Sequence, residues 1–244
     1  MWLFNSSIGK KVLMSVSGIF LILFLTFHAC MNMVSLFSFE AYDAVCEFLG
    51  ANWYALVGTL VLAGGFLIHM VVALILTNGN NKARGNDSYE INGTAPGIEW
   101  SSRYMGVLGV IILGILCVHM GMFWAKMQLV ELFSLDHASC VIGTETVTVA
   151  PSKGAAFLLY WFQNPVVVVC YLLWLVAIWF HLTHGVWSAF HTLGANNNTW
   201  LCRWKTIANI YATIIVLMFA SVVVYYCFVA NSGCECVTEY LHSL

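Results

Sequence analysis

The chain has 244 residues, of which 61% are hydrophobic and only 8% are charged. Water-soluble domains carry about 25% charged residues, so this chain lacks the polar side chains that a surface facing water needs. The net charge of −2, with no basic run and no zinc-ligand spacing, excludes a nucleic-acid-binding protein. The mean hydropathy of +0.86 indicates an integral membrane protein whose apolar residues face lipid.

Charged and helix-breaking residues divide the chain into apolar runs, and a spanning helix needs about 20 such residues. The sequence predicts one all-α membrane domain, residues 1–244, with spans at about 12–37, 53–77, 103–125, 165–193 and 206–231. Asn164-Pro165 and Gly194-Ala195-Asn196 delimit the fourth span. The segment Met1–Leu25 has no small-residue cleavage site and its apolar run is too long for a signal peptide, so we expect the first span to be retained.

The loops predict the orientation of these five spans. With the N-terminus inside and the C-terminus outside, the inner segments hold seven of the nine basic residues: Lys10, Lys11, Lys82, Arg84, Arg103, Arg203 and Lys205. Only Lys126 and Lys153 fall in outer segments. This asymmetry follows the positive-inside rule, and we expect a multi-pass protein of a bacterial cytoplasmic membrane. Neither long loop, 78–102 or 127–160, is large enough for a catalytic domain.

Cysteine usage does not point to covalent cofactor attachment. Of the nine cysteines, five lie in or beside apolar spans, where a thiol behaves as a small hydrophobe. The other four leave a structural disulfide open: Cys46, Cys140, Cys234 and Cys236. The chain contains no C-x-x-C-H sequence, which covalent haem attachment would require.

Histidines fall inside four of the predicted spans, where an ionisable side chain is costly and points to function. These residues are His28, His69, His119, His181 and His184. A single histidine of this kind is commonly only a satisfied polar group in a helix bundle. The depths of the set are more informative, because they fall at two levels.

Counting along each helix at about 1.5 Å per residue places His28 and His119 about 24 Å from the inner surface. His69 and His184 lie about 12–14 Å from that surface, so the two levels are about 10–12 Å apart. Two imidazoles at one depth suit a haem with a ligand on each face, which transfers electrons and leaves no site for oxygen. His181 shares the helix face of His184 and is an alternative ligand or a hydrogen-bonding neighbour.

Other membrane functions fit the sequence less well. Metal-ion sites bring several ligands to one point, usually with carboxylates, and no Asp or Glu lies within a span. A proton channel or pump also needs intramembrane carboxylates. The glycines Gly64, Gly65, Gly114 and Gly185 near the histidines leave room for a porphyrin face or serve close helix packing. A haem-free transporter remains the alternative from a different class.

The chain resembles the single-chain dihaem cytochrome b anchors of succinate:menaquinone oxidoreductases and quinol:fumarate reductases. The resemblance covers nearly the whole chain and is carried by short motifs. They are Ser15-Val16-Ser17-Gly18 through His28, Gly64-Gly65-Phe66-Leu67-Ile68-His69, Ser102-Arg103 through His119, and His184-Gly185 with Ser188-Ala189-Phe190. It implies two haem b groups, the outer one bound by His28 and His119 and the inner one by His69 and His184. The preference for His184 over His181 rests partly on the glycine that follows it.

The resemblance also implies residues around the cofactors. Ser15, Lys11 and Arg103 match positions that bind haem propionates in the family; the alternatives are helix-end packing for Ser15 and positive-inside anchoring for the two cations. We also expect His191, near the inner end, to meet a propionate or a partner subunit. The family's outer quinol site uses an acidic residue just before the second span. The corresponding interval ends on Tyr42, so the neighbouring Asp43 and Glu47 are both candidates.

One position departs from the pattern. Some dihaem fumarate reductases carry a glutamate two residues before the ligand in the fourth span, where it serves proton compensation. This chain has Leu182 there, so that proton route is in doubt.

The resemblance implies a subunit that passes electrons between quinone, expected to be menaquinone, and an iron–sulfur subunit docked on the inner face. A flavoprotein beyond it would interconvert succinate and fumarate, and this chain alone would be silent toward succinate. It has no flavin-binding glycine motif and no iron–sulfur cysteine run. The runner-up is the cytochrome b anchor of another quinone-linked dehydrogenase, which usually concentrates its ligands on fewer helices. The sequence leaves open the direction of turnover and whether the complex dimerises.

Overall fold

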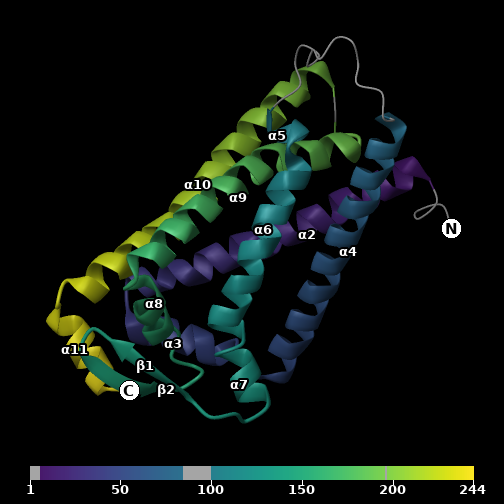
Figure 1. Ribbon diagram of the computed structural model, residues 1–244. Helices are drawn as coiled ribbons and strands as arrows, with labels where there is room; N and C mark the ends of the chain where they lie inside the picture. Colours follow the sequence, from purple (N-terminus) through teal and green to yellow (C-terminus); the bar gives the residue numbers. More distant parts are fainter. Residues whose placement is uncertain (1–5, 85–99, 196) are drawn as a thin grey trace.

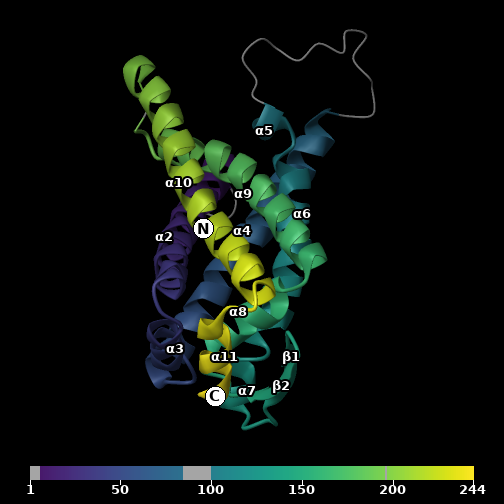
Figure 2. The same cartoon turned by 90° about the vertical axis from the view of Figure 1, so that its left-hand side faces the viewer.

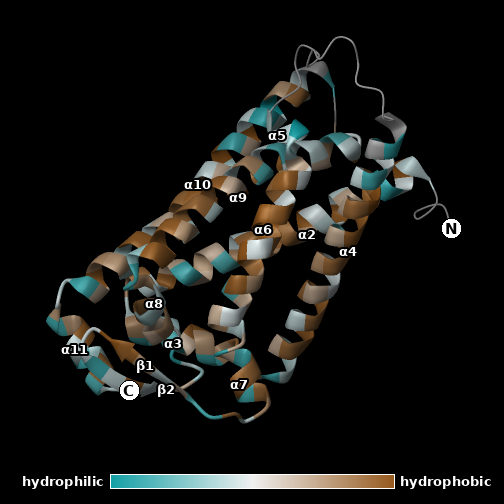
Figure 3. Cartoon of the chain, viewed as in Figure 1, coloured by the Kyte–Doolittle hydropathy of each residue, from teal (hydrophilic) through white to brown (hydrophobic). Residues whose placement is uncertain are grey.

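The computed structural model describes residues 6–84, 100–195 and 197–244 (Figure 1). Five helices in this part of the chain are long and apolar enough to cross a membrane. They are α2 (Ser7–Met33), α4 (Trp53–Arg84), α6 (Met105–His119) continued by the π-helical turn η2 (Met120–Trp124), α9 (Pro165–Thr192) and α10 (Asn198–Asn231). Apolar residues cover most of their length, and polar residues collect toward the ends (Figure 3). The prediction of a mainly helical protein with five helices long and apolar enough to span a membrane is confirmed, although the described residues also form a short two-stranded sheet that the sequence did not predict.

Side-chain caps set several helix ends. Ser6 accepts a hydrogen bond from the Gly9 amide and starts α2, and Asn164 caps α9 immediately before Pro165. Gly194, at φ 91°, ends α9 in the left-handed conformation that glycine adopts without strain. The fourth span is therefore delimited as predicted, although Asn196 lies outside the described residues. The predicted loop 78–102 also lies mostly outside them.

Two spans begin earlier than predicted. The first apolar helix starts at Ser7 and the fifth at Thr199, whereas the sequence placed their starts near residues 12 and 206. In both cases a polar cap begins the helix before the basic residues, which then lie in its first turns. Asn197 accepts hydrogen bonds from the amides of Thr199 and Trp200 at the start of α10. Lysine and arginine are good helix formers, so they do not mark the boundary.

Helix α9 is the centre of the bundle. Within its most apolar window 44% of the residues are buried, compared with 6% in α4. Helix α9 packs against α10, α2 and α6, whereas α4 packs chiefly on α2. Figure 2 also shows α9 between its neighbours. The side of α4 that does not meet α2 is therefore largely free of protein contacts within the described chain.

One end of the bundle carries a cap of short elements, which we call the capped end; the end where α2 begins is the uncapped end. The cap consists of the 3-10 turn η1 (Val34–Leu36), α3 (Phe39–Phe48), α7 (Gln128–Leu132), strands β1 (Ala138–Ile142) and β2 (Glu145–Val149), α8 (Gly154–Phe162) and α11 (Glu235–His242). The short helix α5 (Trp100–Arg103) lies at the uncapped end (Figure 1). The two strands pair antiparallel, with Ala138 opposite Val149 and Ile142 opposite Glu145.

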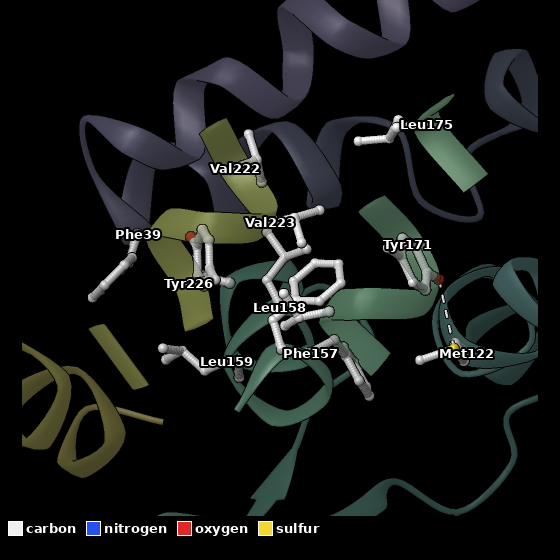
Figure 4. Close-up of a cluster of buried hydrophobic side chains, with 14 of the residues drawn as sticks. Phe39, Met122, Phe157, Leu158, Leu159, Tyr171, Leu175, Val222, Val223 and Tyr226 are labelled. Atoms are coloured by element: carbon white, nitrogen blue, oxygen red, sulfur yellow. Dashed lines mark hydrogen bonds between the residues drawn. The ribbon is translucent and has the colours of Figure 1, made fainter. Parts of the chain in front are cut away.

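A buried cluster joins the cap to the spans (Figure 4). Helix α8 contributes Phe157 and Leu159, and α10 contributes the fully buried Tyr226. Gly154 starts α8 where a side chain would not fit, because a Cβ there would meet the Cys46 sulfur and lie 2.9 Å from the Tyr42 ring. The cap is thus a packed part of the molecule rather than a set of loops.

Candidate functional site

The structure brings the intramembrane histidines together in two pairs. The ring centroids of His28 on α2 and His119 on α6 lie 6.1 Å apart, with the ring planes at 83°. Those of His69 on α4 and His181 on α9 lie 6.3 Å apart, with the planes at 65°. Each pair joins two helices, so four spans contribute one ring each.

The spacing within each pair can be compared with that of two imidazoles on one metal. A metal–nitrogen bond of about 2.0 Å, with about 1.1 Å more to each ring centre, puts two opposed rings about 6.2 Å apart. The observed 6.1 and 6.3 Å fit this value. Among the described residues no three His, Cys, Asp or Glu side chains gather at one point. A two-ligand set suits haem, where the porphyrin supplies the remaining nitrogens.

Several positions near the histidines are open rather than tightly packed. The four paired rings are only half-buried. A Cβ added at Gly64, Gly114 or Gly185 would have no neighbour within 4 Å. Gly65 is different, because a Cβ there would overlap the Phe20 ring, so this glycine allows α2 and α4 to pack closely. Of the glycines noted in the sequence, one therefore serves helix packing and three face open space.

The His28–His119 pair lies toward the capped end and is surrounded by aromatic rings. The centroids of Phe24, Phe219, Phe123 and Trp174 lie 5.1–5.6 Å from one or other of the two histidines. The π-helical turn η2 begins directly after His119, where Ala125 N–H bonds to the Met120 carbonyl. Such turns insert an extra residue into a helix and are frequent at functional sites.

The other pair contains His181 where the sequence favoured His184. His184 lies one turn nearer the uncapped end, with its ring 4.9 Å from that of Trp187. The Nδ1 atom of His181 is buried and has no hydrogen-bond partner within the described structure. The observed ring contact is thus His69–His181, whereas the sequence favoured His184 as the partner of His69.

The separation of the two pairs can be followed along α2 and along α9, since each helix contacts both pairs. Ser17, which contacts His69, precedes His28 on α2 by a stretch of about 16 Å. Tyr171, which contacts His119, precedes His181 on α9 by about 15 Å. Both values are lengths along helix axes rather than depths, so they exceed the 10–12 Å expected from depth alone; α2 crosses the bundle obliquely (Figure 1).

The residues expected to bind propionates lie toward the uncapped end. Ser15 is buried, and its hydroxyl donates to the Lys11 carbonyl at 3.0 Å. Lys11, Arg103 and His191 are exposed. The Arg103 guanidinium lies 5.6 Å from the Tyr104 ring centre, and the His191 ring lies 6.1 Å from that of Trp187. The contacts described for these side chains are with different neighbours, so they do not define one common binding point.

The two carboxylates proposed for quinone chemistry have different surroundings. Asp43 is buried, and its oxygens accept hydrogen bonds from Ala155 N–H at 3.0 Å and Tyr240 Oη at 2.8 Å. Lys153 Nζ lies 3.5 Å from the same carboxylate. Burial raises the pKa of Asp43, although these three partners oppose the rise. Asp43 therefore ties α3 to α8 and α11, a role that the sequence did not suggest.

Glu47, one turn along α3, is exposed. It lines a surface pocket of about 370 Å³ together with Glu131, His137 and Ser152, among other residues. Of the two carboxylates, Glu47 is therefore the one that a small molecule can reach from the surface.

Sequence reasoning missed the hydroxyl groups beside the histidines. Ser17 Oγ lies 3.2 Å from His69 Nδ1, and Tyr171 Oη lies 3.2 Å from His119 Nδ1. Ser17 stands inside a motif that carries the resemblance, but the family pattern pointed to Ser15 instead. No local signal marks Tyr171, because its partner is 52 residues away on another helix. All nine cysteines are free thiols, so the four in polar segments form no disulfide in this structure.

Comparisons with known proteins add no assignment: no protein-family model, curated protein or solved structure matches this chain significantly.

Proposed function

We propose that this chain is the dihaem cytochrome b anchor of a succinate dehydrogenase or fumarate reductase complex. The observation that carries the proposal is the pair of histidine contacts at 6.1 and 6.3 Å, each joining two membrane-spanning helices. Bound there, two b-type haems would supply one-electron transfer across the membrane. His28 and His119 would hold one haem, and His69 and His181 the other. His184 is the competing ligand for the second site.

The proposal includes an orientation. The uncapped end, which carries most of the basic residues, would face the cytoplasm, and the capped end would face outward. An iron–sulfur subunit would dock on the uncapped end and link the chain to the flavoprotein. Arg103, Lys11, Ser15 and His191 belong to that half and would meet propionates or the partner surface. Placement in a bacterial cytoplasmic membrane is part of the same proposal.

Quinone, expected to be menaquinone, would react near the haem at the capped end. Oxidation of a quinol releases protons as well as electrons, so an ionisable side chain at the site is useful. Glu47 is exposed, whereas both oxygens of Asp43 accept hydrogen bonds. We therefore expect Glu47→Gln to impair quinone turnover with both haems retained, and Asp43→Asn to act mainly through the structure of the cap. Normal quinone turnover in both variants would remove the carboxylate from the proposal.

The decisive experiment is a haem count on the chain purified from membranes of the organism or of a haem-proficient host. We expect two haem b per chain by the pyridine haemochrome method and low-spin spectra in both oxidation states. Retention of dye-linked succinate activity by the co-purified complex would support the anchor role. A protein that binds no haem under these conditions would contradict the proposal and favour a transporter. One haem per chain would contradict the pairing.

A further inference from the structure

Each histidine pair contains one ring whose Nδ1 faces a hydroxyl group from another helix. His69 Nδ1 lies 3.2 Å from Ser17 Oγ of α2. His119 Nδ1 lies 3.2 Å from Tyr171 Oη of α9. The partner rings differ. His181 Nδ1 has no hydrogen-bond partner within the described structure, and His28 Nδ1 lies 3.4 Å from the Asn32 amide nitrogen, which cannot accept a proton.

The donor in the hydrogen bond between Ser17 Oγ and His69 Nδ1 can be assigned from the other hydrogen bond that Ser17 makes. A hydroxyl has one proton to donate and two lone pairs to accept with. Ser17 Oγ donates its proton to the Met14 carbonyl at 3.0 Å. What it offers His69 is therefore a lone pair, and Nδ1 of His69 must carry the proton of that contact.

The second contact has the same logic. Tyr171 Oη donates to Met122 Sδ at 3.5 Å, as drawn in Figure 4. With that proton on the sulfur, a lone pair of Tyr171 Oη faces His119 Nδ1. The Nδ1–H tautomer of His119 can then donate to it, and this is the tautomer that iron bound at Nε2 requires. Tyr171 is buried, and its ring packs edge-on against Phe162 and Trp174, so the hydroxyl is held in place.

We propose that Ser17 and Tyr171 are positioning residues that fix the proton of His69 and His119 on Nδ1 and so leave Nε2 of each ring free to bind iron. This inference rests on the proposed function. A hydrogen bond from the far nitrogen of a ligating histidine orients the ring and makes it a stronger electron donor. A stronger donor favours the oxidised iron, so each hydroxyl lowers the reduction potential of its own haem.

The test is a redox titration of Ser17→Ala and Tyr171→Phe in the intact complex, read optically and by the low-spin electron paramagnetic resonance signals. We expect Ser17→Ala to shift only the haem bound by His69 to a more positive midpoint potential. Tyr171→Phe should shift only the haem bound by His119. A tenfold change in the reduction equilibrium would appear as about 59 mV for one electron.

Matched controls test whether the loss of a hydroxyl group away from the histidines also shifts a midpoint potential. Ser221→Ala removes a hydroxyl that donates to the carbonyl of Met218, three residues back, as Ser17 donates to Met14, and Ser221 is exposed. Tyr226→Phe removes a buried phenol that donates to the Ser35 carbonyl. Neither control should move a midpoint. Ser17→Thr, which keeps a hydroxyl, should restore the original value.

The outcomes are distinguishable from failure of the proposed function. If the unaltered chain binds no haem, the cofactor assignment itself is wrong. If it binds two haems and both midpoints and resonance signals stay unchanged in Ser17→Ala and Tyr171→Phe, the positioning role is wrong. Loss of one haem from Ser17→Ala with retention in Ser17→Thr supports the role, and loss from both variants contradicts it.

Discussion

The two histidine pairs have the same ring spacing in very different surroundings. Around His28 and His119 lie aromatic rings from α2, η2, α9 and α10. His69 projects from α4, the span with the fewest buried residues, and contacts Ser17 of α2 and the ring of His181. Aromatic packing therefore holds the first pair, whereas within the described residues the contacts seen at His69 are the Ser17 hydroxyl and the neighbouring ring. A cofactor in the second site would contribute more to its order.

The largest expected effect comes from the ligands themselves. We expect His28→Ala and His119→Ala each to remove the haem at the capped end and to leave the other haem spectrally normal. His69→Ala and His181→Ala should do the reverse, because iron needs both axial nitrogens of a pair. Haem content and redox titration of the four variants measure this.

His184→Ala is the matched control for the second site, since it lies on the same helix one turn away. The haem bound by His69 should survive this change. If His184→Ala removes that haem and His181→Ala retains it, the ring contact of the structure is not the ligand pair.

The next effect tests whether packing makes the capped end independent of the cofactors. Asp43→Ala leaves Ala155 N–H, Tyr240 Oη and Lys153 Nζ without their acceptor. We expect the free energy of unfolding of the cap to fall by about 2–4 kcal/mol. Asp43→Asn keeps an oxygen for Ala155 N–H and should lose about 1 kcal/mol. Limited proteolysis in detergent, read at the cap and at the uncapped end separately, measures both. Equal loss at both ends would contradict the comparison.

The pH dependence of cap stability is a smaller effect. Burial raises the pKa of Asp43, so the folded cap binds this proton more tightly than the unfolded chain does. Stability contributed by this group should therefore be greatest at low pH and should decline as pH rises from about 3.9 through the raised pKa. Asp43→Asn should abolish this component. The difference between the two proteins, measured by unfolding at a series of pH values, isolates it, and an identical slope in both would rule it out.

The smallest effect is expected from Lys153→Met. The ammonium group lies 3.5 Å from the Asp43 carboxylate, but the lysine side chain is 34% exposed. Exposed ion pairs contribute about 0–1 kcal/mol because water and salt screen them. We expect a loss within this range, and it should vanish at high salt. A loss as large as that of Asp43→Ala would show that the lysine, rather than the two hydrogen bonds, holds the carboxylate.

The spans could be predicted from the sequence because each is a long apolar run, and a helix satisfies all its own backbone hydrogen bonds in lipid. The pairing of His28 with His119 follows from counting residues along helices of known rise. The choice between His181 and His184 does not, because both lie on one helix face and the rotation of α9 is set by its packing against three other helices.

The cap was the part that sequence patterns did not reveal. Its elements are short, and they are held by contacts with residues distant in the sequence. One example is the hydrogen bond that Tyr240 of the last helix donates to Asp43. The sequence shows a serine at position 17 but not its role, since a serine in a span commonly bonds only to its own helix. The contact that gives it a second partner comes from α4 and is a property of the folded bundle.

The close fit of Cys46 against Gly154 makes this thiol a reporter of cap movement. Burial raises the pKa of Cys46 to about 12, and a thiol reacts as its thiolate, so alkylating reagents should scarcely modify it in the closed cap. Separation of α3 from α8 would expose it and return its ordinary reactivity. The alkylation rate of Cys46 therefore reports how often the cap opens. If quinone binds near the cap, as proposed, the rate measured with and without quinone would show whether its entry requires the cap to open.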